Sequence, residues 1–123
     1  MKTSIQTLLS AVQLLEKLDM TSMKLSTAYR FNKIITEAKA ATASFEERRV
    51  ALAKKFGKLN DEGTKYEFPT KKDEEAFGAA FGELIQDEVD IVGEKIHIDL
   101  LDEFIKLTPA QIPHALWFID GLE

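Results

Sequence analysis

Apolar side chains recur every three or four positions across residues 25–56 without a break, which is the spacing of an amphipathic α-helix. Gly57 follows this segment in the place expected of a helix-terminating glycine. Lys54 and Lys55 lie in the last turn, where positive charge suits the negative end of the helix dipole. The pattern therefore predicts one long helix over 25–56, roughly 48 Å in length.

One face of this predicted helix carries a near-heptad seam of mostly apolar residues. From Ala28 the seam continues through Phe31, Ile35, Ala38, Thr42, Phe45, Arg49, Leu52 and Phe56. A helix of this length exceeds the expected diameter of a compact domain of 123 residues, so we expect part of the seam to pack against another chain. Arg49 would either extend its charge to solvent or pair with Glu46 of a partner helix across a two-fold axis.

The N-terminal segment predicts an amphipathic helix of about four turns that is capped by Ser4. Its apolar stripe consists of Ile5, Leu8, Leu9, Val12, Leu15 and Leu18. Residues 19–23 break this periodicity, and Ser22 is the candidate cap of the long helix. The two helices are expected to form an antiparallel hairpin in which the short helix covers half of the long one.

Alternation of apolar and polar residues predicts β-structure after the long helix. The segment 89–100 is expected to form a hairpin with a two-residue turn at Gly93-Glu94 and with Ile91 opposite Ile96. A lone hairpin is marginal in water, so either the segment 65–68 joins it as a third strand or the hairpin lies against a helix.

A third helix is predicted from the cap Thr70 to about Glu88. Its buried stripe consists of Phe77, Phe81, Leu84 and Ile85. Gly78 and Gly82 lie four residues apart on it, a spacing that would let a neighbouring backbone approach closely. Residues 100–107 also have helical spacing and predict one or two turns.

The C-terminal segment predicts a helix from Thr108 to about residue 120, with Gln111 reaching back to Thr108 in a capping box. The core stripe of this helix is expected at Ile112, Ala115, Leu116, Ile119 and Leu122. Trp117 and Phe118 are adjacent, so they cannot both face the same neighbour unless the helix is nearly enclosed. One of the two is therefore a candidate docking residue.

Together these elements predict a single domain, 1–123, of the α+β class and mostly α. The expected architecture is an antiparallel helical hairpin with a long second helix, a small antiparallel β-hairpin or three-stranded sheet, and a C-terminal helix packed across it. A hydrophobic content of 45% with eight phenylalanines argues for a folded domain and against disorder.

Few residues carry recognisable chemistry. The chain has no cysteine, and neither His97 nor His114 has a second ligand at metal-binding spacing. Asp87, Glu88 and Asp90 are close in sequence and would either form a solvated turn or hold a divalent ion. Nucleotide-binding and nucleophile motifs are absent from the sequence. We expect a non-enzymatic protein without catalytic residues, metal or cofactor, and keep a small hydrolase as the enzymatic alternative.

Charge and hydropathy narrow the choice of partners. The net charge is −5, and the basic residues between 48 and 58 are interleaved with acids, so nucleic-acid binding is not expected. No apolar run is long enough to span a membrane. The expected partner is therefore a protein, and the expected location is the cytoplasm.

Several segments resemble a family of small tailed-phage proteins that is classed as a domain of unknown function. The resemblance covers most of the chain and rests on the segments 45–49, 54–57, 61–63, 88–91, 95–96 and 107–110. None of these segments is catalytic, and the resemblance implies a phage-encoded protein that acts by binding and needs no cofactor. It also implies a location in the host-cell cytoplasm or in the virion.

The expected function is protein–protein interaction, as a virion-associated or assembly accessory protein. The alternative is a phage inhibitor or modulator that docks on a host protein. Homo-oligomerisation is expected, and replacing Phe45 by Asp should then dissociate the oligomer and leave the monomer folded. The candidate interaction residues are Phe31, Ile35, Phe45, Arg49, Leu52, Phe56, Trp117 and Phe118.

Overall fold

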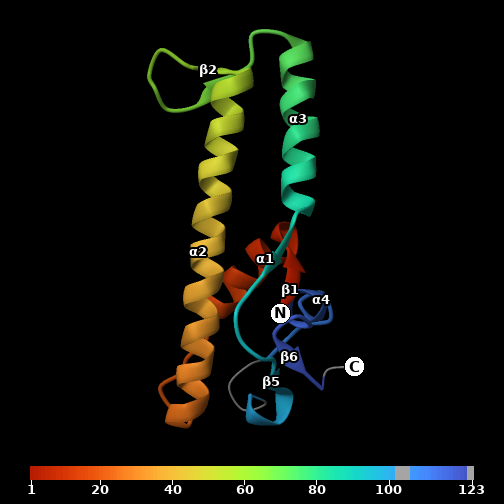
Figure 1. Cartoon of the computed structure of the whole chain (residues 1–123). Coiled ribbons are helices and arrows are strands. Elements are labelled where there is room, and N and C mark those ends of the chain that lie inside the picture. The colour runs from red at the N-terminus through yellow and green to blue at the C-terminus, as the bar shows by residue number, and fades with distance from the viewer. Residues whose placement is uncertain (102–105, 122–123) are drawn as a thin grey trace.

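The computed structural model describes residues 1–101 and 106–121 and has the predicted α+β, mostly α, composition (Figure 1). The elements are, in chain order, β1 (Lys2–Ser4), α1 (Ile5–Glu16), α2 (Leu25–Phe56), β2 (Lys58–Leu59), β3 (Tyr66–Glu67), α3 (Lys71–Gln86), β4 (Glu88–Asp90), β5 (Ile96–His97), the 3₁₀ turn η1 (Ile98–Leu100), α4 (Ile112–Ala115) and β6 (Ile119–Asp120).

The long helix α2 spans Leu25–Phe56, as predicted. Its expected cap was wrong, because the N-cap residue is Lys24 and no side chain bonds the first turn. Gly57 does end the helix, but with an extended backbone. A Cβ at this position would lie 3.0 Å from the carbonyl oxygens of Ala53 and Glu67, so the close approach of the backbone favours glycine there.

Two shorter helices cover α2 in succession (Figure 1). The helix α1 begins at the predicted cap, where the Ser4 hydroxyl accepts a hydrogen bond from the Thr7 N–H at 3.2 Å. It lies beside the N-terminal part of α2, and α3 lies beside the C-terminal part and runs in the opposite direction. The sequence predicted α1 as the cover of one half of α2 and another chain for part of the seam, whereas α3 of the same chain covers the other half.

The strands do not pair as the sequence pattern suggested. Strand β4 pairs with β1, antiparallel, and β5 pairs with β6, parallel, so the predicted hairpin over 89–100 is absent from the described residues. Strand β3 pairs with β2 across the turn at 60–63, and does not add a third strand to another sheet. The pairings of β1 with β4 and of β5 with β6 satisfy backbone hydrogen bonds between distant segments, which alternation within one segment cannot match to one another.

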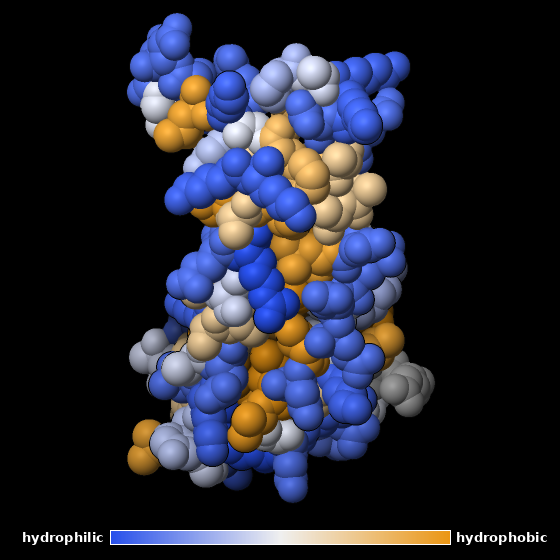
Figure 2. Space-filling view, turned by 45° about the horizontal axis from the view of Figure 1, so that its top comes forward, coloured by the Kyte–Doolittle hydropathy of each residue, from blue (hydrophilic) through white to orange (hydrophobic). Residues whose placement is uncertain are grey.

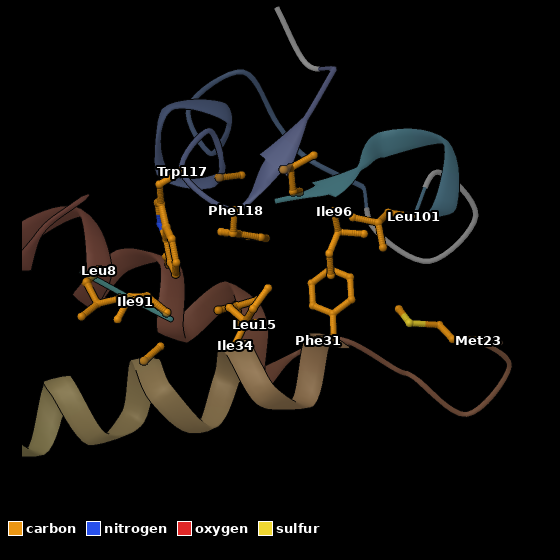
Figure 3. Close-up of a cluster of buried hydrophobic side chains, with 14 residues drawn as sticks. Leu8, Leu15, Met23, Phe31, Ile34, Ile91, Ile96, Leu101, Trp117 and Phe118 are labelled. Atoms are coloured by element: carbon orange, nitrogen blue, oxygen red, sulfur yellow. The ribbon is translucent and has the colours of Figure 1, made fainter. Parts of the chain in front are cut away.

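The main core lies where α1 and α2 meet the C-terminal segment (Figure 3). Phe31 points from α2 toward Ile96 and Phe118, and its ring meets that of Phe118 edge-on at a centroid distance of 6.3 Å. Trp117 lies against the other side of Phe118, with centroids 4.9 Å apart. This cluster joins residues from both ends of the chain and fixes the short C-terminal strands against the helices.

The C-terminal helix is much shorter than predicted. Gln111 does reach back to the Thr108 N–H, with its Oε1 accepting at 2.9 Å. The α-helix α4, however, covers only Ile112–Ala115 before the chain turns into β6. Trp117 and Phe118 lie in this turn and are both buried, so the prediction of one exposed aromatic is wrong. The predictions for residues 102–105 and for Leu122 lie outside the described residues.

Gly78 and Gly82 of α3 do not mark a close contact between the described segments, because no heavy atom of these segments, apart from the surrounding backbone of α3 itself, lies within 4 Å of a Cβ built at either position. Gly78→Ala should therefore raise the free energy of unfolding by about 0.5–1 kcal/mol, because alanine favours the helix over glycine by about that amount. Urea titration followed by circular dichroism measures this change. A lower midpoint would show that another backbone occupies this space in solution.

Candidate interaction surface

The upper part of the molecule is an arm of two helices, formed by residues 45–56 of α2, by α3 and by the β2–β3 hairpin (Figure 1). Two packed helices bury only the sides that face each other, so the outer faces of the arm stay open to solvent. At the base of the arm, Phe45 packs with Ile5 and Leu84 in a second, smaller core. The arm thus leaves apolar side chains only partly covered.

Aromatic contacts extend from this smaller core along the arm. The rings of Phe45 and Phe81 are 6.1 Å apart between centroids, and those of Phe81 and Phe77 are 5.9 Å apart. Phe68, just before α3, continues the series with its centroid 4.9 Å from that of Phe77. The contact of Phe45 with Phe81 holds α3 against α2, and the other two hold the segment before α3 on that helix, so the arm is preorganised for docking.

A shallow groove of about 480 Å³ runs between α2 and α3 on one side of the arm. Its floor is formed by Ala51, Leu52, Ala80 and Leu84. Leu84 is buried, Leu52 and Ala80 are half-buried, and Ala51 is exposed. Hydrophobic side chains also gather in a band between hydrophilic flanks on the face shown in Figure 2. The groove therefore combines a small apolar floor with helical walls.

The charges on the rim of the groove are sorted by helix. Arg48 and Lys55 line it from α2, and Glu83 and Asp87 line it from α3. Arg48 Nη1 and Asp87 Oδ2 are 3.7 Å apart across the lower end of the groove. Both side chains are more than half exposed, so this ion pair stabilises the arm only weakly. One rim is therefore positive and the opposite rim is negative.

The structure separates the predicted interaction residues into two groups. Four of them belong to the chain's own cores and are not available on the surface, which corrects the prediction: Phe31, Phe45, Trp117 and Phe118. Ile35 is half-buried against the main core. Leu52 lies in the floor of the groove, and Phe56 is half-buried at the end of α2 with Lys55 Nζ 5.3 Å from its ring centroid.

Arg49 binds Glu46 of its own helix. Its Nε donates to Glu46 Oε2 at 2.7 Å and its Nη2 donates to Oε1 at 2.9 Å. This bidentate hydrogen bond lowers the pKa of the Glu46 carboxyl and raises the pKa of the Arg49 guanidinium. The alternative in which Arg49 pairs with Glu46 of a partner helix is not needed to satisfy this charge.

This ion pair gives a pH dependence with a definite sign. A carboxyl whose pKa is lower in the folded state stabilises the fold above its ordinary pKa and loses that contribution as the pH falls through the folded value. Glu46→Gln should cost about 0.3–0.5 kcal/mol of unfolding free energy at neutral pH, as exposed helical pairs do. The difference should vanish in urea titrations at a pH below the folded pKa of Glu46. An equal difference at every pH would contradict this origin.

The three carboxylates at the end of α3 do not converge on one point. Asp87 faces Arg48, Glu88 is 3.9 Å from Lys2 Nζ, and Asp90 is 3.0 Å from the amino group of Met1. Within residues 1–101 and 106–121, no three histidine, aspartate or glutamate side chains are grouped so that they could hold a metal ion. Each acid thus has its own cation in place of a shared ligand.

The two histidines lie apart. His97 Nδ1 accepts a hydrogen bond from the Asp99 N–H at 3.2 Å. His114 lines a hollow of about 370 Å³ between α1 and α4 together with Lys17 and Lys106. Across the described part of the chain, no helix is both long and apolar enough to cross a membrane.

Sequence reasoning found the α2 side of the groove but missed the α3 side. Ala80, Glu83 and Leu84 join the surface only because α3 packs antiparallel on α2, and no periodicity within α2 indicates which residues lie opposite. It also missed Leu25 and Tyr29, one turn apart at the start of α2 and 87% and 70% exposed. The sequence shows their spacing on α2, but it does not show which parts of α2 the rest of the chain leaves uncovered.

Comparison of the chain with models of known families, with curated proteins and with solved structures gives no match in any of the three. The candidate surface therefore rests on the chain's own geometry.

Proposed function

We propose that the protein is a non-enzymatic protein–protein interaction module and that the groove of the arm is its docking surface. The observation that supports this proposal is the groove itself, where an apolar floor on two helices lies between a positive and a negative rim. A helix or a helical pair fits such a groove, because ridges of side chains from the partner can lie along the space between α2 and α3.

The resemblance to small tailed-phage proteins supports a phage-encoded protein, and we propose a virion-associated or assembly accessory role for it. Such a protein would act in the host-cell cytoplasm and bind without a cofactor. The apolar floor and the sorted rim charges are the features that would select its partner.

A photoreactive amino acid at Ala51 tests this function directly, because Ala51 is exposed and lies in the groove floor. Irradiation of the cell that naturally makes the protein should give a cross-linked product with one defined protein, identified by mass spectrometry. That protein can be this chain, a virion protein or a host protein, and its identity decides between an assembly role and inhibition of a host protein.

The same photoreactive residue at Glu62, in the exposed turn between β2 and β3, is the matched control. We expect no defined product from this position, because it lies outside the groove. The absence of any product from Ala51, or the same products from both positions, would contradict the proposal.

A further inference from the structure

We infer that the hollow between α1 and α4 binds a phosphate group and that its ligand is a small phosphate ester. The hollow lies apart from the groove of the arm, so this inference goes beyond the proposed function and does not depend on it. It follows from the side chains that line the hollow, from the contacts of the neighbouring acids and from an apolar wall beside the charges.

One wall of the hollow is a row of polar side chains on α1. Ser10, Gln13 and Lys17 line the hollow and lie three and four residues apart in sequence, which places them on one face of the helix. This face adjoins the buried stripe of α1 that contains Ala11 and Leu15. Because the stripe fixes the rotation of α1 against the core, the polar row is held toward the space beside α4.

The opposite wall adds donors from the C-terminal segment. Lys106, Gln111 and His114 line the hollow from this side. The Oε1 atom of Gln111 accepts a hydrogen bond from the Thr108 N–H at 2.9 Å, so the other polar atom of this amide is the Nε2 donor. The imidazole of His114 has an N–H donor whether it is neutral or charged. Donors therefore line both sides of the hollow.

The hollow is a positive region on an acidic protein. The net charge of the chain is −5, yet the described lining holds two lysines and no carboxylate. The acids nearest to Lys17 in sequence have other partners, since Glu16 is 3.7 Å from the Nζ atom of Lys39 and Asp19 accepts hydrogen bonds from Thr21. Two ammonium groups suit a dianion, and a phosphate monoester carries about −1.5 to −2 charge at pH 7.

The end of α1 weakens this attraction only slightly. A helix C-terminus carries about half a negative charge, which is small against two lysine charges. The carbonyl oxygens of Leu14 and Leu15 accept hydrogen bonds from the N–H groups of Lys17 and Leu18 at 3.3 and 3.2 Å. These carbonyls are therefore satisfied by the backbone and do not need the Lys17 ammonium.

The hollow has room for more than the phosphate group. Its volume of about 370 Å³ falls within the roughly 300–1,000 Å³ of small-molecule sites. Leu14 and Leu18 also line it, and both are half-buried against the main core. They would contact the organic part of an ester while the ammonium and N–H groups bind the phosphate oxygens. The mixed lining favours an ester over the free ion.

Titration followed by amide NMR spectra of nitrogen-labelled protein tests the site. Inorganic phosphate and phenyl phosphate are added separately at constant ionic strength, because added salt screens charges. Both should cause shifts that saturate and that centre on residues 10–18 and 111–116, and phenyl phosphate should have the lower Kd. Equal Kd values would overturn the ester and assign the site to free phosphate. The absence of saturating shifts in these segments would overturn the site itself.

Lys17→Gln should raise the Kd for phenyl phosphate about tenfold, as expected for the loss of one charge-assisted hydrogen bond. Lys33→Gln is the matched control, because it removes the same charge from an exposed lysine of α2 that does not line the hollow. Lys17 is also exposed, so both variants should keep the helical signal in circular dichroism. Equal rises in Kd for the two variants would show a general effect of net charge and overturn the site.

Discussion

Replacing Phe45 by Asp should unfold the protein. Phe45 is 5% exposed and packs with Ile5, Leu84 and Phe81 at the base of the arm. Truncating a buried phenylalanine costs about 3–5 kcal/mol, and an unpaired carboxylate in its place adds several kcal/mol more. The sum approaches the roughly 5–15 kcal/mol that stabilises a typical domain. Circular dichroism should show loss of most helical signal at room temperature.

Ser44→Asp is the matched control, since Ser44 precedes Phe45 and is exposed. This variant should keep its helical signal and unfold cooperatively. Unfolding of Phe45→Asp is the opposite of the expectation from the sequence, which was that this substitution dissociates an oligomer and leaves the monomer folded. A folded Phe45→Asp variant would contradict the packing described here and restore that earlier expectation.

Phe31→Ala should lower the free energy of unfolding by about 3–5 kcal/mol. Phe31 has no exposed surface and lies between Phe118 and the rest of the main core, where its loss leaves a cavity. Urea titration should show a lower midpoint with an unchanged slope. The variant should still fold if the domain has ordinary stability, because no polar or charged group is buried by the change.

Tyr29→Ala is the control for this second substitution. Tyr29 lies two residues before Phe31 on the same helix and is 70% exposed, so its truncation should change stability by at most about 0.5 kcal/mol. Equal losses for the two variants would show that Phe31 is not at the centre of the core.

Local signals predicted α1, α2 and α3 well but made the C-terminal helix too long. The bounds of α2 and the caps at Ser4 and Thr70 follow from periodicity and from short-range hydrogen bonds, which the sequence displays directly. The strand pairings were wrong because β1 with β4 and β5 with β6 join segments far apart in the chain. Alternation shows that a segment suits a strand and does not indicate its neighbour.

The candidate surface was predicted only in part, for the same reason. Leu52 lies in the groove and Phe56 and Arg49 lie on the arm, but the proximal half of the seam is covered by α1 and the C-terminal segment. Trp117 and Phe118 are buried because the chain leaves the helical path after Ala115. Each of these outcomes depends on tertiary contacts that one helix cannot reveal.

The two cores and the groove account for two kinds of variant. Substitutions at Phe31 or Phe45 should act on folding, because both side chains are buried in cores. Substitution of the exposed Ala51 by Arg should leave folding intact, because arginine is also a good helix former, and should block the groove with a large charged side chain. Ala40→Arg, at an exposed position earlier on α2, is its control.

The most direct test is capture of partner proteins from the cell that naturally makes the protein, with the natural sequence, Ala40→Arg and Ala51→Arg compared side by side. The account predicts that one defined protein binds the natural sequence and Ala40→Arg, and that Ala51→Arg loses it, because Ala51 lies in the groove and Ala40 does not. Binding of the same protein by Ala51→Arg, or no defined protein on the natural sequence, would contradict docking through the groove.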